Sequence, residues 1–129
     1  MLVAGRRFGK TYLALTELLH ASIAKPGSIN WYVAPTYRQA KQIAWKSLKQ
    51  MIPPSQIAAT NETDLSVELH NGTTAALRGA DNYDALRGVG LDFVVMDEFA
   101  DMHAGAWFEV LRPMLADKQG RALWIGTPK

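Results

Sequence analysis

Short runs of apolar residues, rich in β-branched and aromatic side chains, alternate along the chain with stretches in which apolar residues recur at helical spacing. Four of the runs have the length and composition of strands, at residues 1–4, 29–34, 91–96 and 121–127. Strands that alternate with helices are typical of a parallel sheet covered by helices. The pattern therefore predicts an α/β fold with a mostly parallel central sheet.

Helical spacing predicts three helices between these strands. The first ends before the Pro-Gly pair at 26–27. Thr36 can cap the second, which runs to the proline pair at 53–54. The third spans residues 107–114, and Pro113 is expected to bend or interrupt it.

A different pattern covers residues 57–79, where apolar and polar side chains alternate on both sides of Asn71-Gly72. An Asn-Gly pair between alternating segments favours a tight turn. We therefore expect a β-hairpin inserted into the α/β framework.

The composition is that of one compact domain. The chain has 129 residues, of which 48% are hydrophobic, enough to bury a core. It contains no cysteine, so neither a disulfide framework nor a thiolate metal site is available. The histidines are scattered, and no apolar run approaches the roughly 18 residues of a membrane span. We expect a soluble intracellular protein.

The net charge of +2 conceals an uneven distribution. Residues 1–50 hold eight Lys or Arg against the single acid Glu17, whereas residues 51–129 hold six bases and eleven acids. A basic first half suits a ligand that carries phosphates, either a nucleotide or a nucleic acid. Taken alone, the lysines of the second helix are equally consistent with a solvated helix face.

The segment AGRRFGKT contains most of a phosphate-binding loop and lies between a predicted strand and a predicted helix. Gly9, Lys10 and Thr11 match the end of the pattern, whereas Ala4 stands at its first glycine position. The backbone N–H groups of such a loop bind phosphates at a helix N-terminus. Lys10 would bridge the β- and γ-phosphates of ATP, and Thr11 would bind Mg²⁺. The alternative is a glycine-containing turn before a helix.

Two adjacent carboxylates follow the apolar run LDFVVM. Asp97 is expected at the C-terminal end of its strand, where ligands of α/β sheets gather, and would orient Mg²⁺. Glu98 would polarise the attacking water. Because two adjacent acids repel each other, a metal ion or a proton has to be nearby. The alternative is an Asp-Glu pair that caps a helix.

The last predicted strand ends in GTPK. Thr127, at a strand end beside the phosphate loop, would sense the γ-phosphate and couple its presence to whatever follows. By itself the same sequence is typical of an ordinary strand-to-turn junction.

These three motifs, in this order and spacing, resemble the ATPase domain of the terminase large subunit, the genome-packaging motor of tailed bacteriophages. The likeness covers nearly the whole chain and includes GRRFGKT, VAPTYRQAKQIAW and LRGVGLDFVVMDE. It implies a P-loop NTPase of the RecA-like (ASCE) class, a three-layer sandwich. It also implies that ATP binds along the phosphate loop, at Gly5, Arg6, Arg7, Phe8, Gly9, Lys10 and Thr11.

The resemblance also implies roles for two arginines. Arg6 would contact the phosphates in cis, and Arg87 would be a finger offered to the ATP of a neighbouring subunit, so that both would act in catalysis with Glu98. A guanidinium can neutralise the charge that develops on the transferred phosphoryl group. The alternative for Arg87 is a surface loop arginine.

The implied activity is Mg²⁺-dependent ATP hydrolysis coupled to translocation of double-stranded DNA. The implied partners are the portal protein, the small terminase subunit and further copies in a homo-oligomeric ring, in the host cytoplasm. The family's adenine-recognition segment and nuclease domain are not found in residues 1–129. We therefore expect a single ATPase domain that is truncated at both ends relative to the family.

Two other interpretations stay open. A nucleic-acid-dependent helicase also has an acidic pair after an apolar strand, although the two arginines in the loop and the lack of a second RecA-like domain oppose it. A non-catalytic prophage remnant that binds nucleotide weakly is favoured by the missing N-terminal segment. The intact Lys10, Thr11, Asp97 and Glu98 oppose the remnant interpretation.

Overall fold

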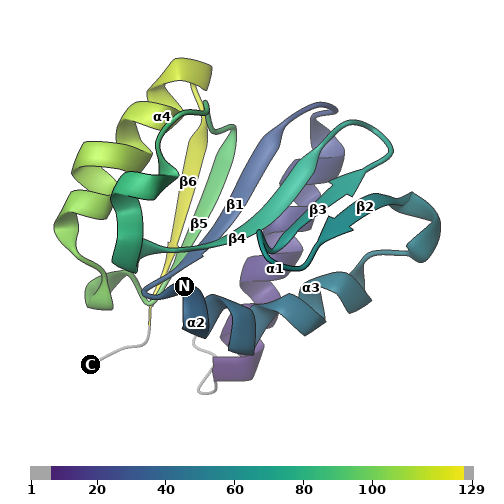
Figure 1. The fold of residues 1–129 in the computed structure, drawn as a ribbon, viewed down its shortest axis with the longest axis horizontal. Coiled ribbons are helices and arrows are strands. Elements are labelled where there is room, and N and C mark those ends of the chain that lie inside the picture. The colour runs from purple at the N-terminus through teal and green to yellow at the C-terminus, as the bar shows by residue number, and fades with distance from the viewer. Residues whose placement is uncertain (1–6, 127–129) are drawn as a thin grey trace.

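A six-stranded sheet forms the centre of the molecule, for which a computed structural model describes residues 7–126 (Figure 1). The strands lie in the order β2-β3-β4-β1-β5-β6. Strands β4, β1, β5 and β6 pair in parallel, whereas β2 and β3 are antiparallel to their neighbours. Their bounds are β1 Ile29–Ala34, β2 Ile57–Asn61, β3 Ser66–Leu69, β4 Thr74–Gly79, β5 Phe93–Asp97 and β6 Arg121–Ile125. The predicted α/β class and mostly parallel sheet are confirmed.

Helices cover both faces of this sheet and complete the three layers (Figure 1). One face is covered by α1 Arg7–Ala24, α2 Tyr37–Ala40, the π-helical η1 Lys41–Trp45 and α3 Lys46–Met51. The other face is covered by η3 Ala80–Leu86, the π-helical η5 Ala106–Leu111 and α4 Arg112–Lys118. Two short 3₁₀ turns, η2 Pro54–Gln56 and η4 Phe99–Asp101, complete the described elements. Each face buries its own apolar cluster, as the alternation of side chains along a strand requires.

The hairpin predicted around Asn71-Gly72 is confirmed, and it belongs to the central sheet. Its two strands are β3 and β4, and Gly72 has the positive φ of +85° that a tight turn requires. Because β4 pairs in parallel with β1, the hairpin and β2 extend the sheet on that side.

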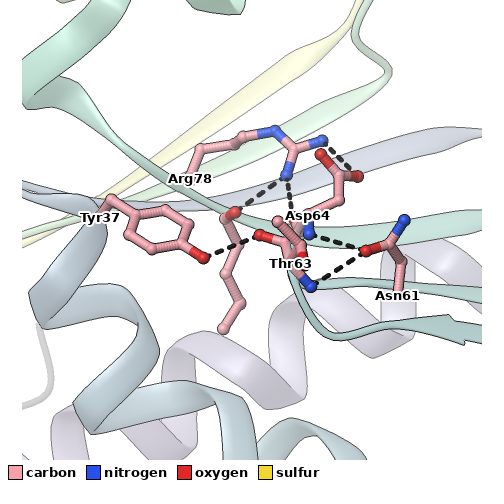
Figure 2. Close-up of polar contacts among 6 residues, drawn as sticks. Tyr37, Asn61, Thr63, Asp64 and Arg78 are labelled. Atoms are coloured by element: carbon pink, nitrogen blue, oxygen red, sulfur yellow. Dashed lines mark hydrogen bonds and ion pairs between the residues drawn. The ribbon is translucent and has the colours of Figure 1, made fainter.

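The turn that joins β2 to β3 is fixed from two sides (Figure 2). Asn61 closes the turn, since its Oδ1 accepts hydrogen bonds from Thr63 N and Asp64 N. From α2, the Tyr37 hydroxyl donates to Thr63 O at 2.7 Å. From β4, Arg78 donates to Asp64 O at 2.7 Å and pairs with the Asp64 carboxylate at 3.3 Å. These contacts tie the outer strands of the sheet to the helix that follows β1.

The helix boundaries follow the sequence signals. Thr36 caps α2 as predicted, because its Oγ1 accepts a hydrogen bond from Gln39 N at 3.0 Å. Pro113 lies in the first turn of α4, where the chain changes from π-helical to α-helical winding. Proline has no N–H to continue the preceding hydrogen-bond ladder, so the predicted interruption is confirmed.

Two of the predicted strands have different bounds in the structure. The run predicted at 91–96 forms a strand only from Phe93 to Asp97, because Leu91 N bonds instead to Met114 O. The run at 121–127 is a strand as far as Ile125. The predicted strand at 1–4 lies outside the described residues.

Within residues 7–126, no helix is long and apolar enough to cross a membrane.

Asp92 joins the start of β5 to the start of β1. Its carboxylate accepts hydrogen bonds from Lys25 Nζ at 2.6 Å and from Ile29 N at 2.9 Å. Burial raises the pKa of Asp92, but these hydrogen bonds outweigh burial and hold the pKa below its ordinary value. The stabilisation is therefore complete above the ordinary aspartate pKa and is lost as pH falls through the lower pKa of the folded state.

Asp92→Ala is expected to lower the free energy of unfolding by about 1–3 kcal/mol at neutral pH, because Ile29 N loses its charged acceptor. Urea unfolding of the variant and the wild type measures this loss. In acid, where the wild-type carboxylate is protonated, the difference should shrink. Asp117→Ala, at an exposed aspartate of α4, is the matched control and should change stability little. An equal loss at both pH values would contradict the role of the charged carboxylate.

Candidate functional site

The predicted phosphate-binding and acidic residues meet at one edge of the sheet. Asp97 is the last residue of β5, and Lys10 and Thr11 lie near the N-terminus of α1. Carboxyl ends of parallel strands and the N-terminus of the following helix form the ligand-binding edge of α/β proteins. All three side chains are buried. Lys10 and Asp97 therefore lie at the same end of the sheet, as a nucleotide site requires.

Lys10 bridges the two acidic residues. Its Nζ lies 2.7 Å from Asp97 Oδ1, and it also pairs with Glu98 Oε1. The Lys10 side chain is only 6% exposed, so these carboxylates compensate for the loss of water around its ammonium group. Among the described residues, the two adjacent acids therefore share the ammonium group of Lys10.

Two buried oxygen atoms beside Lys10 have unused hydrogen-bonding capacity. Thr11 Oγ1 has no hydrogen-bond partner in the described part of the chain. Asp97 Oδ1 likewise accepts no aligned hydrogen bond there, because the nearby Lys10 ammonium is close but poorly directed. Buried oxygens without a hydrogen bond are rare and costly. Thr11 Oγ1 therefore marks a position where a bound group would be stabilised, and Asp97 Oδ1 can accept a hydrogen bond or a cation in addition to its ion pair with Lys10.

Tyr32 is a site residue that the sequence motifs did not indicate. Its hydroxyl donates to Asp97 Oδ2 at 2.5 Å, and the whole side chain is buried. Burial raises the pKa of Tyr32 far above its ordinary value, and the charge of Asp97 raises it further. A weak signal was present, because a tyrosine at an inward position of an apolar strand needs a polar partner where phenylalanine would not.

Glu98 adopts a left-handed backbone conformation, with φ 57° and ψ 48°. For a residue other than glycine this conformation is strained, and such strain is concentrated at functional sites. The Glu98 amide donates to Ile125 O in β6, so the turn out of β5 is fixed. In this conformation the Glu98 carboxylate forms an ion pair with Lys10 Nζ.

The other residues predicted to bind nucleotide are described only in part. Helix α1 begins at Arg7, so Arg7, Phe8 and Gly9 lie in its first turn, immediately before Lys10. Gly5, Arg6 and Thr127 lie outside the described residues.

Arg87 lies in a different layer from Lys10. Its guanidinium donates to Asp84 Oδ1 at 3.2 Å and to Glu109 O at 3.1 Å. Glu109 belongs to η5, which covers the face of the sheet opposite α1. The Arg87 side chain is 52% exposed. The structure thus gathers Lys10, Thr11, Asp97 and Glu98 with Tyr32 and places Arg87 at the surface beside η5.

Comparison with known proteins gives one consistent result. Residues 1–128 match the family model of the N-terminal part of terminase large subunits of the T4likevirus type. The large terminase subunit of Thermus phage G20c is 35% identical over 144 residues, which cover 97% of this chain and 30% of that protein. That of Escherichia phage T5 is 34% identical over 128 residues, which cover 96% of this chain and 29% of that protein.

A solved structure has the same fold at similar identity. The large terminase ATPase domain of Thermus phage P74-26 is 30% identical, with a TM-score of 0.77, and the match covers 96% of this chain and 57% of that one. This chain thus spans about a third of the length of the curated relatives. By the family model and by these relatives, the chain belongs to the terminase large subunit family, in its N-terminal part.

Proposed function

We propose that this chain is the ATP-hydrolysing motor domain of a phage DNA-packaging terminase and that it binds MgATP beside Lys10. The observation that carries the proposal is the ion pair between Lys10 and Asp97, 2.7 Å long, at the edge where α1 begins and β5 ends. The similar protein of Thermus phage P74-26 is described as an ATPase domain, which supports the same activity here.

The residues at this edge fit a magnesium ion. Mg²⁺ prefers oxygen ligands and is usually held by one or two carboxylates, water and substrate phosphates. Thr11 Oγ1 and Asp97 Oδ1 are buried oxygens with capacity for such an ion. Residues 7–126 contain no group of three or more His, Cys, Asp or Glu that could hold a metal ion. When bound, the ion would supply positive charge against the phosphates.

Lys10 and Glu98 would change partners when ATP binds. The β- and γ-phosphates would take the Lys10 ammonium away from the carboxylates, and the N-terminal amides of α1 would add further donors. Glu98, no longer paired with Lys10, would orient the attacking water and accept its proton. We propose that Arg6 contacts the phosphates from within the loop. We also propose that Thr127 senses whether the γ-phosphate is present and couples its presence to the rest of the protein.

The proposed polymer substrate is double-stranded DNA. The helix formed by α2, η1 and α3 contains no acidic residue over 37–51, and its Arg38, Lys41 and Lys46 are exposed. Exposed bases on one helix suit the phosphate backbone of a nucleic acid. The portal protein, the small terminase subunit and other copies of the large subunit are the proposed protein partners, by family membership.

Lys10→Ala is expected to weaken MgATP binding by about 100-fold, because a charged hydrogen-bond donor to the phosphates is lost. Calorimetric titration of the purified chain with MgATP measures the affinity, and circular dichroism confirms that the variant is folded. Lys46→Ala removes the same charge from an exposed position of α3 and is the matched control. Wild-type affinity in Lys10→Ala would contradict the site, and binding without turnover in the wild type would favour a non-catalytic remnant.

A further inference from the structure

The buried phenol of Tyr32 lies beside the acidic pair, and the role assigned to it rests on the proposed function. We infer that Tyr32 is a positioning residue for Mg²⁺ binding: its hydroxyl holds one oxygen of Asp97 so that the other faces Lys10 and the bound nucleotide. No phosphate-loop or acidic-strand motif includes this tyrosine.

The two oxygens of Asp97 have different environments. Oδ2 accepts the hydrogen bond from the Tyr32 hydroxyl at 2.5 Å, whereas Oδ1 lies 2.7 Å from Lys10 Nζ. A carboxylate can rotate and exchange its oxygens, because its terminal torsion is broad and nearly two-fold. The hydrogen bond from the phenol fixes the plane of the carboxylate instead. Because the two oxygens are chemically equivalent, one oxygen is always bonded to the phenol and the other always faces the ligand side.

The sheet holds the tyrosine in place for this contact. Tyr32 is paired in register with Val95 of the parallel strand β5, and Asp97 lies two residues further along β5 on the same face. The Tyr32 ring is fully buried in the apolar cluster that includes Leu15 and Leu18 of α1. A ring packed between a strand and a helix has little freedom, so the hydroxyl presents its proton to Asp97 from a fixed point.

A neutral donor suits this task better than a charged one. An ordinary phenol keeps its proton at neutral pH, so the Tyr32 hydroxyl remains a donor to Asp97. It orders the carboxylate without neutralising it, which leaves the negative charge of Asp97 for a cation. Lys10 does the opposite, since its charge cancels that of a carboxylate and is expected to move to the phosphates.

Thr11, the other residue proposed to bind Mg²⁺, also lies beside Tyr32. The Thr11 hydroxyl lies near the Tyr32 hydroxyl, although it makes no aligned hydrogen bond within residues 7–126. Both oxygen ligands proposed for the metal therefore border the same tyrosine. A group that supports a metal ligand in this way contributes typically 10–100-fold to metal affinity.

The test is nucleotide affinity as a function of Mg²⁺ concentration, measured by titrating the purified chain with a fluorescent ATP analogue. Mg²⁺ is expected to raise the nucleotide affinity of the wild type. For Tyr32→Phe, the Mg²⁺ concentration at which half of this increase is reached should be about 10–100-fold higher. Affinity in EDTA should stay within about twofold of the wild type, because the phosphate contacts of Lys10 remain. Tyr37→Phe removes the hydrogen bond to Thr63 O at the β2–β3 turn and serves as the matched control.

Unchanged Mg²⁺ dependence in Tyr32→Phe would overturn the inference while leaving the proposed function intact. An equal loss of affinity with Mg²⁺ and with EDTA would also overturn it, since that result indicates only a structural role. A wild type without Mg²⁺-dependent nucleotide binding would overturn the proposed function and the inference together.

A second pair of variants decides the question if Tyr32→Phe alone does not fold. Asp97→Asn replaces the buried charge by an amide, which tolerates the loss of the phenol donor better than a carboxylate does. If Tyr32 acts through the Asp97 carboxylate, Asp97→Asn with and without Tyr32→Phe should have the same Mg²⁺ dependence. A further shift of tenfold in the double variant would overturn the inference.

Discussion

Glu98→Gln is expected to bind MgATP with near wild-type affinity and to hydrolyse it about 10²–10⁴-fold more slowly, the usual contribution of a general base. Glutamine retains the shape of the side chain and a hydrogen-bond acceptor, but it cannot take a proton from the attacking water. In the nucleotide-free structure the carboxylate is paired with Lys10, and the left-handed backbone at Glu98 directs it there. Removing the carboxylate charge should therefore affect turnover far more than binding.

Steady-state release of phosphate and titration with MgATP measure the two quantities separately. Glu68→Gln makes the same chemical change at an exposed position of β3 and should leave both unchanged. Turnover in Glu98→Gln equal to that of the wild type would remove Glu98 from the catalytic role. A loss of binding as large as the loss of turnover would show that the carboxylate acts mainly on the structure of the site.

The meeting of Lys10 and Asp97 could be predicted from the sequence because topology leaves little choice. A helix that follows a phosphate loop begins at the sheet edge where parallel strands end, and an acidic residue at the end of a strand lies at the same edge. Only the order of the elements is needed for that argument. The ion pair of 2.7 Å agrees with it, even though the strand predicted at 1–4 lies outside the described residues.

The role of Tyr32 could not be predicted in the same way, because it depends on register. The hydroxyl reaches Asp97 only because β1 and β5 are paired in parallel with Tyr32 opposite Val95. A shift of one residue would turn the phenol to the other face of the sheet. The left-handed backbone of Glu98 is also a product of its surroundings, since no glycine or asparagine marks it in the sequence.

The hairpin and the helices show a similar limit. Asn71-Gly72 indicates a turn, but the local pattern does not say that β4 continues the parallel sheet beside β1. The apolar spacing of the second helix predicts a helix without distinguishing the π-helical winding of η1 from α-helix. Both features depend on packing between distant parts of the chain, and a local sequence pattern contains no information about such packing.

Arg87→Ala is expected to lower turnover by about 10³-fold or more in an assembled ring and to have little effect on the isolated chain, because an arginine finger stabilises charge only when it reaches the transferred phosphoryl group. In the structure its guanidinium is bound to Asp84 and to the Glu109 carbonyl, on the face opposite α1. With its side chain 52% exposed, Arg87 is accessible to a neighbouring subunit.

Mixing two inactive proteins separates action in trans from action in cis. The corresponding Arg87→Ala and Glu98→Gln changes would be made in full-length large subunits of Thermus phage G20c, a relative 35% identical to this chain. In a randomly mixed ring, about one interface in four joins an intact arginine to an intact glutamate, so a finger in trans restores a measurable share of activity. A finger in cis restores none, because no subunit carries both groups. Absence of recovery in rings shown to contain both proteins would therefore indicate that Arg87 acts on the ATP of its own subunit, or that it only stabilises the structure beside η5.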